Sequence, residues 1–277
     1  TTQMYIWKKL IQFLTKFLNK NMIVNYNELT SKIKGTKVDK PISGTLSGHS
    51  AGEPFDKHVN EILNKKYKGK VFRQYEYLNY LFTKNPDIVG DKARNSLFNS
   101  PTLMFLLSRG KNATNKWSID NPFEEKQNDT ADILVVNNDF HEIIDIKTRN
   151  MSKSAQPPNI ISAYKLAQTC AKMIDNKEFK SFNINYFEID WMLEGNYLVC
   201  KDSHHKELFK ANPSTFYINW AAAMQLQFHV KDLDQTYCGS REDWAREYLK
   251  YFVSSAKKRT KDMMVKFVIP FEKYIKE

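Results

Sequence analysis

The chain has 277 residues, 42% of them hydrophobic, with a formal net charge of +11 and a pI near 9.3. This size and apolar content suit a globular protein of one large domain or two small ones, and no apolar run approaches the ~20 residues that a membrane span requires. The basic excess favours an anionic partner, and we expect nucleic acid rather than a membrane.

Three cysteines, Cys170, Cys200 and Cys238, are widely separated and never arranged as a Cys-x-x-Cys pair. Their odd number and their spacing argue against a zinc site or a disulfide framework. The sequence also shows no signal peptide, so we expect the protein to work in a reducing cytoplasm.

The segment from Met4 to Leu18 carries apolar and basic residues at helical spacing. This pattern is typical of a helix that lies on a membrane surface. It is equally compatible with an upstream extension that has no function, because Met22 offers an alternative start. We favour the extension, and expect residues 1–21 to be an N-terminal appendix and residues 22–277 a single domain.

The first helix that we expect in this domain begins near Pro54. Proline is tolerated at the first helical position, and Phe55, Val59 and Ile62 then recur at the spacing of one buried helix face. The sequence therefore predicts a helix that packs on the core.

A β-hairpin is expected in the middle of the chain. Residues 131–136 and 140–147 are apolar, β-branched runs separated by polar turn residues. A turn centred on residues 137 and 138 pairs Asp132 with Ile143, and Asp145 then lies diagonally opposite Asp132 on the same face. A slip of one residue would send the two carboxylates to opposite faces.

Three charged residues meet on that face: Asp132, Asp145, which follows 13 positions later (145 − 132), and Lys147. Alternate side chains of a strand share a face, so Asp145 and Lys147 point the same way. Two converging carboxylates suit Mg²⁺, which takes oxygen ligands and keeps several waters. An ammonium beside the metal can orient a water and offset charge on a phosphate. The alternative is an ion pair on an exposed strand.

A polar loop follows directly after Lys147. Arginine and lysine meet guanine or phosphate, and glutamine and asparagine can pair with adenine, so this loop is suited to DNA. A helix is expected from Asn159 onward, with its core face at Ile160, Tyr164 and Ala167. Asn159 is compatible with DNA contact or with an N-cap of that helix.

A second hairpin is expected from residues 182–192 and 197–200, turning near Gly195. Residues 224–230 alternate strictly and predict another strand. The pair His204-His205 does not predict a metal site, because adjacent residues do not share a helix face and no third ligand is near.

The last helix is expected to begin at Ser240, which forms a capping-box pattern with Asp243. Its basic face is compatible with phosphate contact or with simple solvation. Pro270 should kink or interrupt it.

Longer strings resemble the HincII family of type II restriction endonucleases, within the PD-(D/E)xK nuclease superfamily. Asp132 followed by Asp145-Ile146-Lys147 matches the bipartite motif of that superfamily. The resemblance extends from about Lys20 to the C-terminus. The strings that carry it are Ser43–His49, Gln127–Leu134, Asp145–Asn150, Ser152–Gln156, Asn159–Asp175 and Tyr217–Met224.

The resemblance implies an α/β fold, a mixed central sheet flanked by helices, and a homodimer that cuts double-stranded DNA with Mg²⁺ and no small-molecule organic cofactor. It implies cleavage at the centre of GTYRAC in a bacterial cytoplasm, as part of a restriction-modification system. Asp132, Asp145 and Lys147 would be catalytic, with Asp132 and Asp145 on the metal. The expected DNA-contacting residues are Thr148, Arg149, Asn150, Lys153, Gln156, Asn159, Tyr217 and Asn219, with Gln156 wedged into the base stack.

The chain departs from the superfamily motif at one position, where Ala131 replaces the usual proline before the first aspartate. The alternative motif at Pro86-Asp87 is rejected, because its second acid, Asp91, lies only four positions later (91 − 87) and leaves no room for a hairpin. Superfamily members often add an acid from an early helix, which makes Glu53 or Asp56 a candidate, although a helix dipole alone explains acids there.

Two other classes of protein share part of this pattern. A DNA-binding module without catalysis has no reason to keep Asp132, Asp145 and Lys147 together. A metal-dependent repair or recombination nuclease needs no base-reading loops and should cut without sequence preference.

Overall fold

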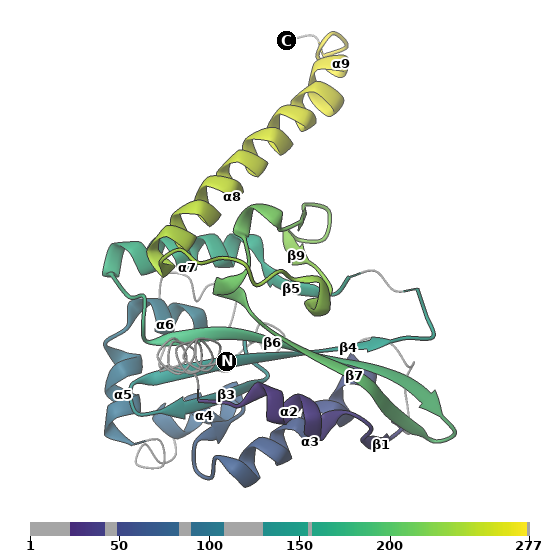
Figure 1. Cartoon of the computed structure of the whole chain (residues 1–277). Helices are drawn as coiled ribbons and strands as arrows, with labels where there is room; N and C mark the ends of the chain where they lie inside the picture. The colour runs from purple at the N-terminus through teal and green to yellow at the C-terminus, as the bar shows by residue number, and fades with distance from the viewer. Residues whose placement is uncertain (1–22, 42–48, 83–89, 108–129, 155–156, 276–277) are drawn as a thin grey trace, which may run out of the picture.

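The computed structural model describes residues 23–41, 49–82, 90–107, 130–154 and 157–275 (Figure 1). It has the predicted α/β architecture, in which a mixed sheet is flanked by helices. The N-terminal segment before Met22, the rejected Pro86-Asp87 motif and Gln156 lie outside the described residues.

The large sheet has the strand order β1-β7-β6-β4-β3-β2. Neighbouring strands run antiparallel except for β4 and β6, which are parallel, so the sheet is mixed as expected. The strands are β1 (Lys37–Asp39), β2 (Val71–Phe72), β3 (Ile133–Asn137), β4 (Phe140–Asn150), β6 (Phe182–Glu194) and β7 (Tyr197–Glu207).

The hairpin of β3 and β4 forms with a register two residues away from the predicted one. Ile143 pairs with Leu134, not with Asp132, and Ile144 pairs with Ile133. The turn is centred one residue later than expected, because Asn138 adopts the left-handed conformation (φ 55°) that a tight hairpin turn requires. A shift of two residues keeps every side chain on its predicted face. The charged residues therefore still converge.

The two faces of the sheet are covered by different helices. Helices α2 (Tyr26–Ile33) and α3 (His49–Lys66) pack on one face through a cluster that includes Ile133, Ile144 and Phe187. The opposite face packs on the later helices through Leu134, Ile143 and Tyr186. Those helices are α4 (Gln74–Phe82), α5 (Asp91–Phe98), α6 (Pro101–Leu107), α7 (Ala163–Asn176) and α8 (Arg241–Met263).

Helix α3 is longer at its start than predicted. It begins at His49, so Pro54 lies inside the helix and not at its first position. Its expected core face is confirmed, because Phe55 and Val59 are fully buried and Ile62 packs against the same cluster.

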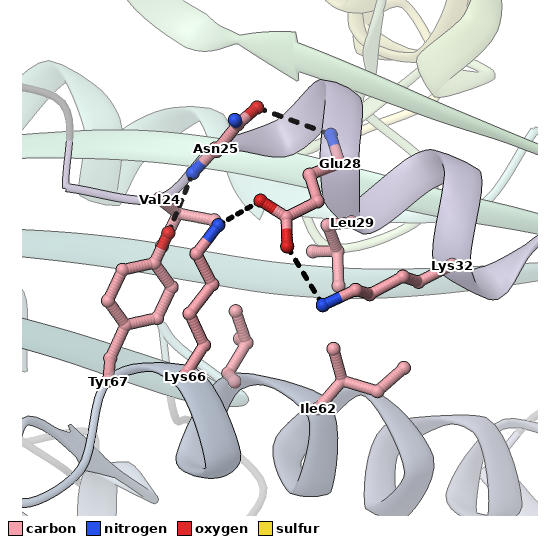
Figure 2. A pocket seen from close by; sticks show the side chains of 9 residues that line it. Val24, Asn25, Glu28, Leu29, Lys32, Ile62, Lys66 and Tyr67 are labelled. Carbon is pink, nitrogen blue, oxygen red and sulfur yellow. Dashed lines mark hydrogen bonds and ion pairs between the residues drawn. The ribbon is translucent and has the colours of Figure 1, made fainter.

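A small pocket lies between α2 and α3 and is closed by polar contacts (Figure 2). Glu28 forms ion pairs with Lys32, at 2.8 Å, and with Lys66. The Tyr67 hydroxyl accepts a hydrogen bond from the backbone N–H of Asn25 at 3.0 Å. The space that a water molecule could occupy is about 10 Å³, room for at most one. This pocket therefore belongs to the packing of the two helices.

A second, smaller sheet has the order β5-β9-β8 and contains the segment where a helix was predicted from Asn159. Residues Asn159–Ser162 form strand β5, and α7 begins only at Ala163, with Ser162 as its N-cap. The predictions of a helix start and an N-cap at Asn159 are wrong, since backbone pairing with β9 (Gln225–Gln227) holds residues 159–162 extended. Strand β8 (Ile218–Asn219) completes this sheet.

The predictions for the C-terminal half are largely confirmed. Strands β6 and β7 turn at Gly195 (φ 62°), although β7 runs further than expected. Ser240 and Asp243 form the capping box of α8. Ahead of Pro270, the helix is interrupted by a π-helical turn (η6, Met264–Val268) before α9 (Ile269–Glu272). The end of α8 and α9 project away from the body (Figure 1).

Candidate active site

The two acidic residues of the motif lie side by side in the hairpin, Asp145 within β4 and Asp132 just before β3. Asp132 immediately precedes β3 and lies one step beyond the pair Ile133 and Ile144, which brings it opposite Asp145 in β4. Two contacts fasten it there: its backbone N–H donates to Ile144 O at 3.0 Å, and its Oδ2 accepts from the Ile146 N–H at 2.6 Å. The carboxylate of Asp132 is therefore oriented by the strand that carries Asp145.

Lys147 completes the cluster from the same face of β4. Its Nζ donates to Asp145 Oδ1 at 3.0 Å and lies 2.9 Å from Oδ2. The lysine side chain is 21% exposed and that of Asp145 11%. The ammonium thus contacts both oxygens of a nearly buried carboxylate. The attraction between these two charges is much stronger than that of an ion pair in open solvent. The alternative of an exposed surface ion pair is excluded.

Burial decides the electrostatics of this cluster. It raises the pKa of Asp145 well above its usual range; the ammonium of Lys147 opposes the shift and the carboxylate of Asp132 adds to it. Burial also pushes the pKa of Lys147 down, but the charges of Asp145 and Asp132 outweigh this effect, and that pKa is raised. Carboxyl groups this close together in a medium of low polarity resist joint ionisation, and a cation at the site favours their charged forms.

A third acid reaches the cluster from helix α3. Burial, and then the charge of Asp132, raise the pKa of Asp56 to about 8, while Arg73 opposes the shift. Glu53 instead pairs with Lys57 at 2.8 Å and is exposed. Of the two acids considered from sequence, Asp56 therefore lies at the site and Glu53 at the surface.

Arg73 is a residue of the site that the sequence motif did not reveal. Its Nη1 donates to the backbone oxygen of Asp132 at 3.2 Å and lies 3.9 Å from Asp56 Oδ2. It directly follows β2, which pairs with β3. Only the pairing of β2 with β3 brings Arg73 close, and nothing in its local sequence predicted this.

These residues fit a hard divalent cation. The available donors are carboxylate oxygens, which Mg²⁺ prefers. The Lys147 ammonium already occupies a cation position against both oxygens of Asp145. Within the described ranges, no three His, Cys, Asp or Glu side chains form a ready-made metal cluster. A bound Mg²⁺ would therefore take its remaining ligands from water and phosphate, as this ion commonly does.

The residues expected to contact DNA fall into two groups. Thr148, Arg149 and Asn150 end strand β4, and exposed Lys153 follows in the loop. Arg149 is engaged within the protein, because its guanidinium donates from Nε to Asp190 Oδ1 at 2.7 Å and from Nη2 to Oδ2.

The second group lies on the small sheet. Asn159 in β5 and Asn219 in β8 are far apart in sequence, and both bond to Gln227 of β9. Tyr217 precedes β8 and is 61% exposed. The adjacent histidines contact different neighbours: His204 Nε2 lies 3.4 Å from Asp190 Oδ2, while the ring of His205 stacks on Tyr26.

Comparison with known proteins identifies the class of enzyme. A family profile described as restriction endonuclease HincII matches residues 29–275. Two curated relatives from Haemophilus influenzae are 64% and 63% identical over 250 residues: the type II restriction enzymes HindII and HincII. Each alignment covers 90% of this chain and 97% of the relative. A solved NlaIV restriction endonuclease aligns with 89% of both chains at 10% identity, but its TM-score of 0.36 supports no conclusion.

These relatives and the nuclease-like cluster on a mixed sheet define a type II restriction endonuclease, an enzyme that cleaves DNA at specific sites. The chain belongs to the HincII restriction endonuclease family. Among the residues that the structure describes, no helix is both long and apolar enough to cross a membrane.

Proposed function

We propose that the protein hydrolyses phosphodiester bonds of double-stranded DNA with Asp132, Asp145 and Lys147 as its catalytic residues. The observation that carries this proposal is the convergence of the two carboxylates and the ammonium on one face of the β3–β4 hairpin. Family membership supplies the reaction class, and the geometry supports a role for each residue.

Asp132 and Asp145 would hold Mg²⁺, which supplies positive charge for the scissile phosphate and for the attacking water. The Lys147 ammonium would orient that water and offset the charge that builds on the phosphate as the bond to phosphorus forms, while the proton of the attacking water passes to bulk water. In-line attack breaks the bond to the 3′-oxygen, leaving a 3′-hydroxyl and a 5′-phosphate. Arg73, bonded to the backbone of Asp132, would keep the first carboxylate in place.

The proposed target is a palindrome, which by family resemblance is GTYRAC cut bluntly at its centre. Two-fold symmetric DNA is best read by a two-fold symmetric homodimer. The central pyrimidine-purine step unstacks easily, and this favours recognition through DNA deformation. The proposed DNA contacts are Thr148, Arg149, Asn150, Lys153, Gln156, Asn159, Tyr217 and Asn219.

Two exposed groups support this assignment of partners. Asn159 and Tyr217 present polar and aromatic surface on the small sheet. Large apolar side chains, including Phe267 and Phe271, are exposed beyond the body and support self-association.

We further propose that residues 22–277 act as one unit, which agrees with the family match over residues 29–275. The relatives are bacterial, and we place the activity in the bacterial cytoplasm.

A plasmid digest tests the proposal. Wild-type protein with Mg²⁺ should give discrete bands, and none with a chelator; a smear would indicate a nuclease without sequence preference, and intact plasmid a DNA-binding module without catalysis. Asp145→Ala should bind DNA without cutting it, with a loss of at least about 1000-fold in rate. The matched control is Asp139→Ala, in the exposed turn of the same hairpin, which should cut like wild type. Equal cleavage by Asp145→Ala and wild type would refute the assignment.

A further inference from the structure

Three amide side chains link the strands of the small sheet. Asn219 Nδ2 donates to Gln227 Oε1 at 2.9 Å, and Gln227 Nε2 donates to Asn159 Oδ1 at 2.8 Å. Gln227 of the middle strand, β9, thus bridges β8 and β5. The two residues that it bridges, Asn219 and Asn159, are among those proposed above to contact DNA.

The direction of every bond in this chain of amides follows from the protein backbone. The N–H groups of Ala221 and Ala222 donate to Asn219 Oδ1 at 3.0 and 3.1 Å. A backbone N–H can only donate, so that side-chain atom must be oxygen and Asn219 must turn its NH₂ group toward Gln227. Gln227 must then accept with its oxygen and donate with its nitrogen to Asn159. The orientation of all three amides, normally ambiguous, is thereby determined.

This polarity decides what the two asparagines can offer a ligand. Asn219 Oδ1 uses both lone pairs on backbone groups, so Asn219 retains only one N–H for another partner. Asn159, which is exposed, retains both hydrogens of its NH₂ group and one lone pair on its oxygen. The surface of the small sheet therefore presents mainly hydrogen-bond donors.

In the major groove, donors match N7 and O6 of guanine, N7 of adenine and O4 of thymine. An asparagine reads adenine fully by donating to N7 and accepting from the N6 amino group. Asn219 cannot make that paired contact, since its oxygen is saturated. Asn159 can, but only while Gln227 holds its NH₂ group outward.

We propose that Gln227 is a specificity-determining positioning residue, which orients Asn159 and Asn219 to present donors to acceptor atoms of bases in the major groove. This inference rests on the proposed function and extends it. Gln227 acts through the two asparagines. A glutamine in a short strand is otherwise unfavourable compared with a β-branched residue, and its backbone N–H is already bonded to Tyr217 O at 3.1 Å.

Gln227→Glu reverses the direction of the hydrogen bond between residue 227 and Asn159. A carboxylate accepts but does not donate, so it keeps its bond from Asn219 while Asn159 must rotate to donate to it. Asn159 then turns its oxygen outward and presents an acceptor. We expect discrimination, the ratio of kcat/KM for the cognate site to that for a site with one base pair replaced, to fall by roughly 10-fold to 100-fold at one base pair and its symmetry mate. Other base pairs should keep their ratios.

The matched control is Gln225→Glu, which makes the same chemical change two residues away on the same face of β9, outside the chain of amides. Both variants add the same charge near DNA, so both should weaken binding, but Gln225→Glu should leave every ratio unchanged. Gln227→Met removes both side-chain hydrogen bonds of Gln227. It should lower the discrimination ratios at the base pairs that Asn159 and Asn219 contact. If Gln227→Glu does not fold, as judged by its melting temperature, this variant decides the question by the same ratios.

The outcomes are distinguishable. A uniform loss of rate on all sites, or the same altered ratios in Gln225→Glu, would mean that Gln227 is merely structural and would overturn the inference. Specific cleavage by the wild type with ratios unaffected by Gln227 refutes the inference and leaves the proposed function standing. A wild-type protein that does not cut DNA refutes both.

Discussion

At the scale of single residues, the ion pair of Arg149 and Asp190 links β4, the strand of the proposed catalytic residues, to its neighbour β6. Arg149 follows Lys147 by two residues and pairs with Asp190 in the parallel register of β4 and β6. The Asp190 side chain is only 3% exposed. A partly buried arginine that loses its buried carboxylate partner keeps an uncompensated charge beside the core.

Asp190→Asn should therefore lower the free energy of unfolding by about 3 kcal/mol, measured by urea denaturation. Asp202→Asn is the control, because Asp202 also lies near His204 but is 44% exposed and pairs with Lys34 at the surface. It should cost less than about 1 kcal/mol. Similar losses for both variants would contradict the importance of burial here.

The buried His141 gives stability a predictable pH dependence. Burial lowers its pKa to about 4, from an ordinary value near 6.5. Between these values the unfolded chain binds a proton that the folded protein does not, so the free energy of unfolding falls as pH drops through this window. The loss of free energy of unfolding caused by His141 reaches about 3 kcal/mol near pH 4. Above pH 6.5 this loss vanishes.

His141→Gln, which cannot titrate and can still bond to Tyr77, should show a flatter dependence between pH 4 and 6.5. Denaturant unfolding at several pH values measures this. The comparison is between variant and wild type, because His205, whose pKa burial lowers to about 3, contributes in the same direction in both proteins. Parallel curves for the two proteins would rule His141 out as the source.

At the scale of elements, the turn between β3 and β4 places the two acids. Asn138 adopts φ 55°, a conformation that asparagine and glycine tolerate and β-branched residues do not. The turn sets which residues of β3 and β4 face each other, and so brings Asp132 opposite Asp145.

Asn138→Val should lower the free energy of unfolding by about 1–2 kcal/mol, because the branched β-carbon of valine crowds the backbone in this left-handed conformation, which asparagine tolerates. Asn138→Gly should keep or slightly raise stability. Thermal melts of both proteins make the test, and equal melting temperatures would mean that the turn does not hold this conformation in solution.

At the scale of the whole molecule, the projecting C-terminal segment exposes a series of large apolar side chains. Phe267 and Phe271 are 53% and 56% exposed and lie near Met264 and Tyr274, which are also exposed. They recur every three or four residues along the segment, which thus offers a partner a series of exposed apolar side chains. This segment is a candidate interface for the proposed homodimer.

The double variant Phe267→Ser with Phe271→Ser should weaken self-association at least about 10-fold, since each side chain would lose apolar contact. Sedimentation should show wild type near twice the chain mass of 32.5 kDa. Tyr197→Ser, which removes another exposed ring at the far hairpin, is the control and should remain dimeric. An unchanged dimer in the double variant would move the interface elsewhere.

Local chemistry determined much of what the sequence predicted. The capping box at Ser240 and the interruption before Pro270 depend on residues close in the chain, and both are confirmed. The strand predicted from the alternation of residues 224–230 forms only at Gln225–Gln227. The grouping of Asp132, Asp145 and Lys147 was also predictable, because strand alternation and a short hairpin preserve faces even when the register shifts by two.

What only the tertiary structure decided are the contacts between distant segments. Arg73 and Asp56 join the site through β2 and α3, and no local pattern predicts a backbone contact 59 positions away. Residues 159–162 form a strand instead of the predicted helical turn because β9 pairs with them. The same pairing places Gln227 between Asn159 and Asn219. The preference of a segment for helix or strand depends on neighbouring residues in the chain. Strand pairing and burial depend on the distant segments that the fold brings close.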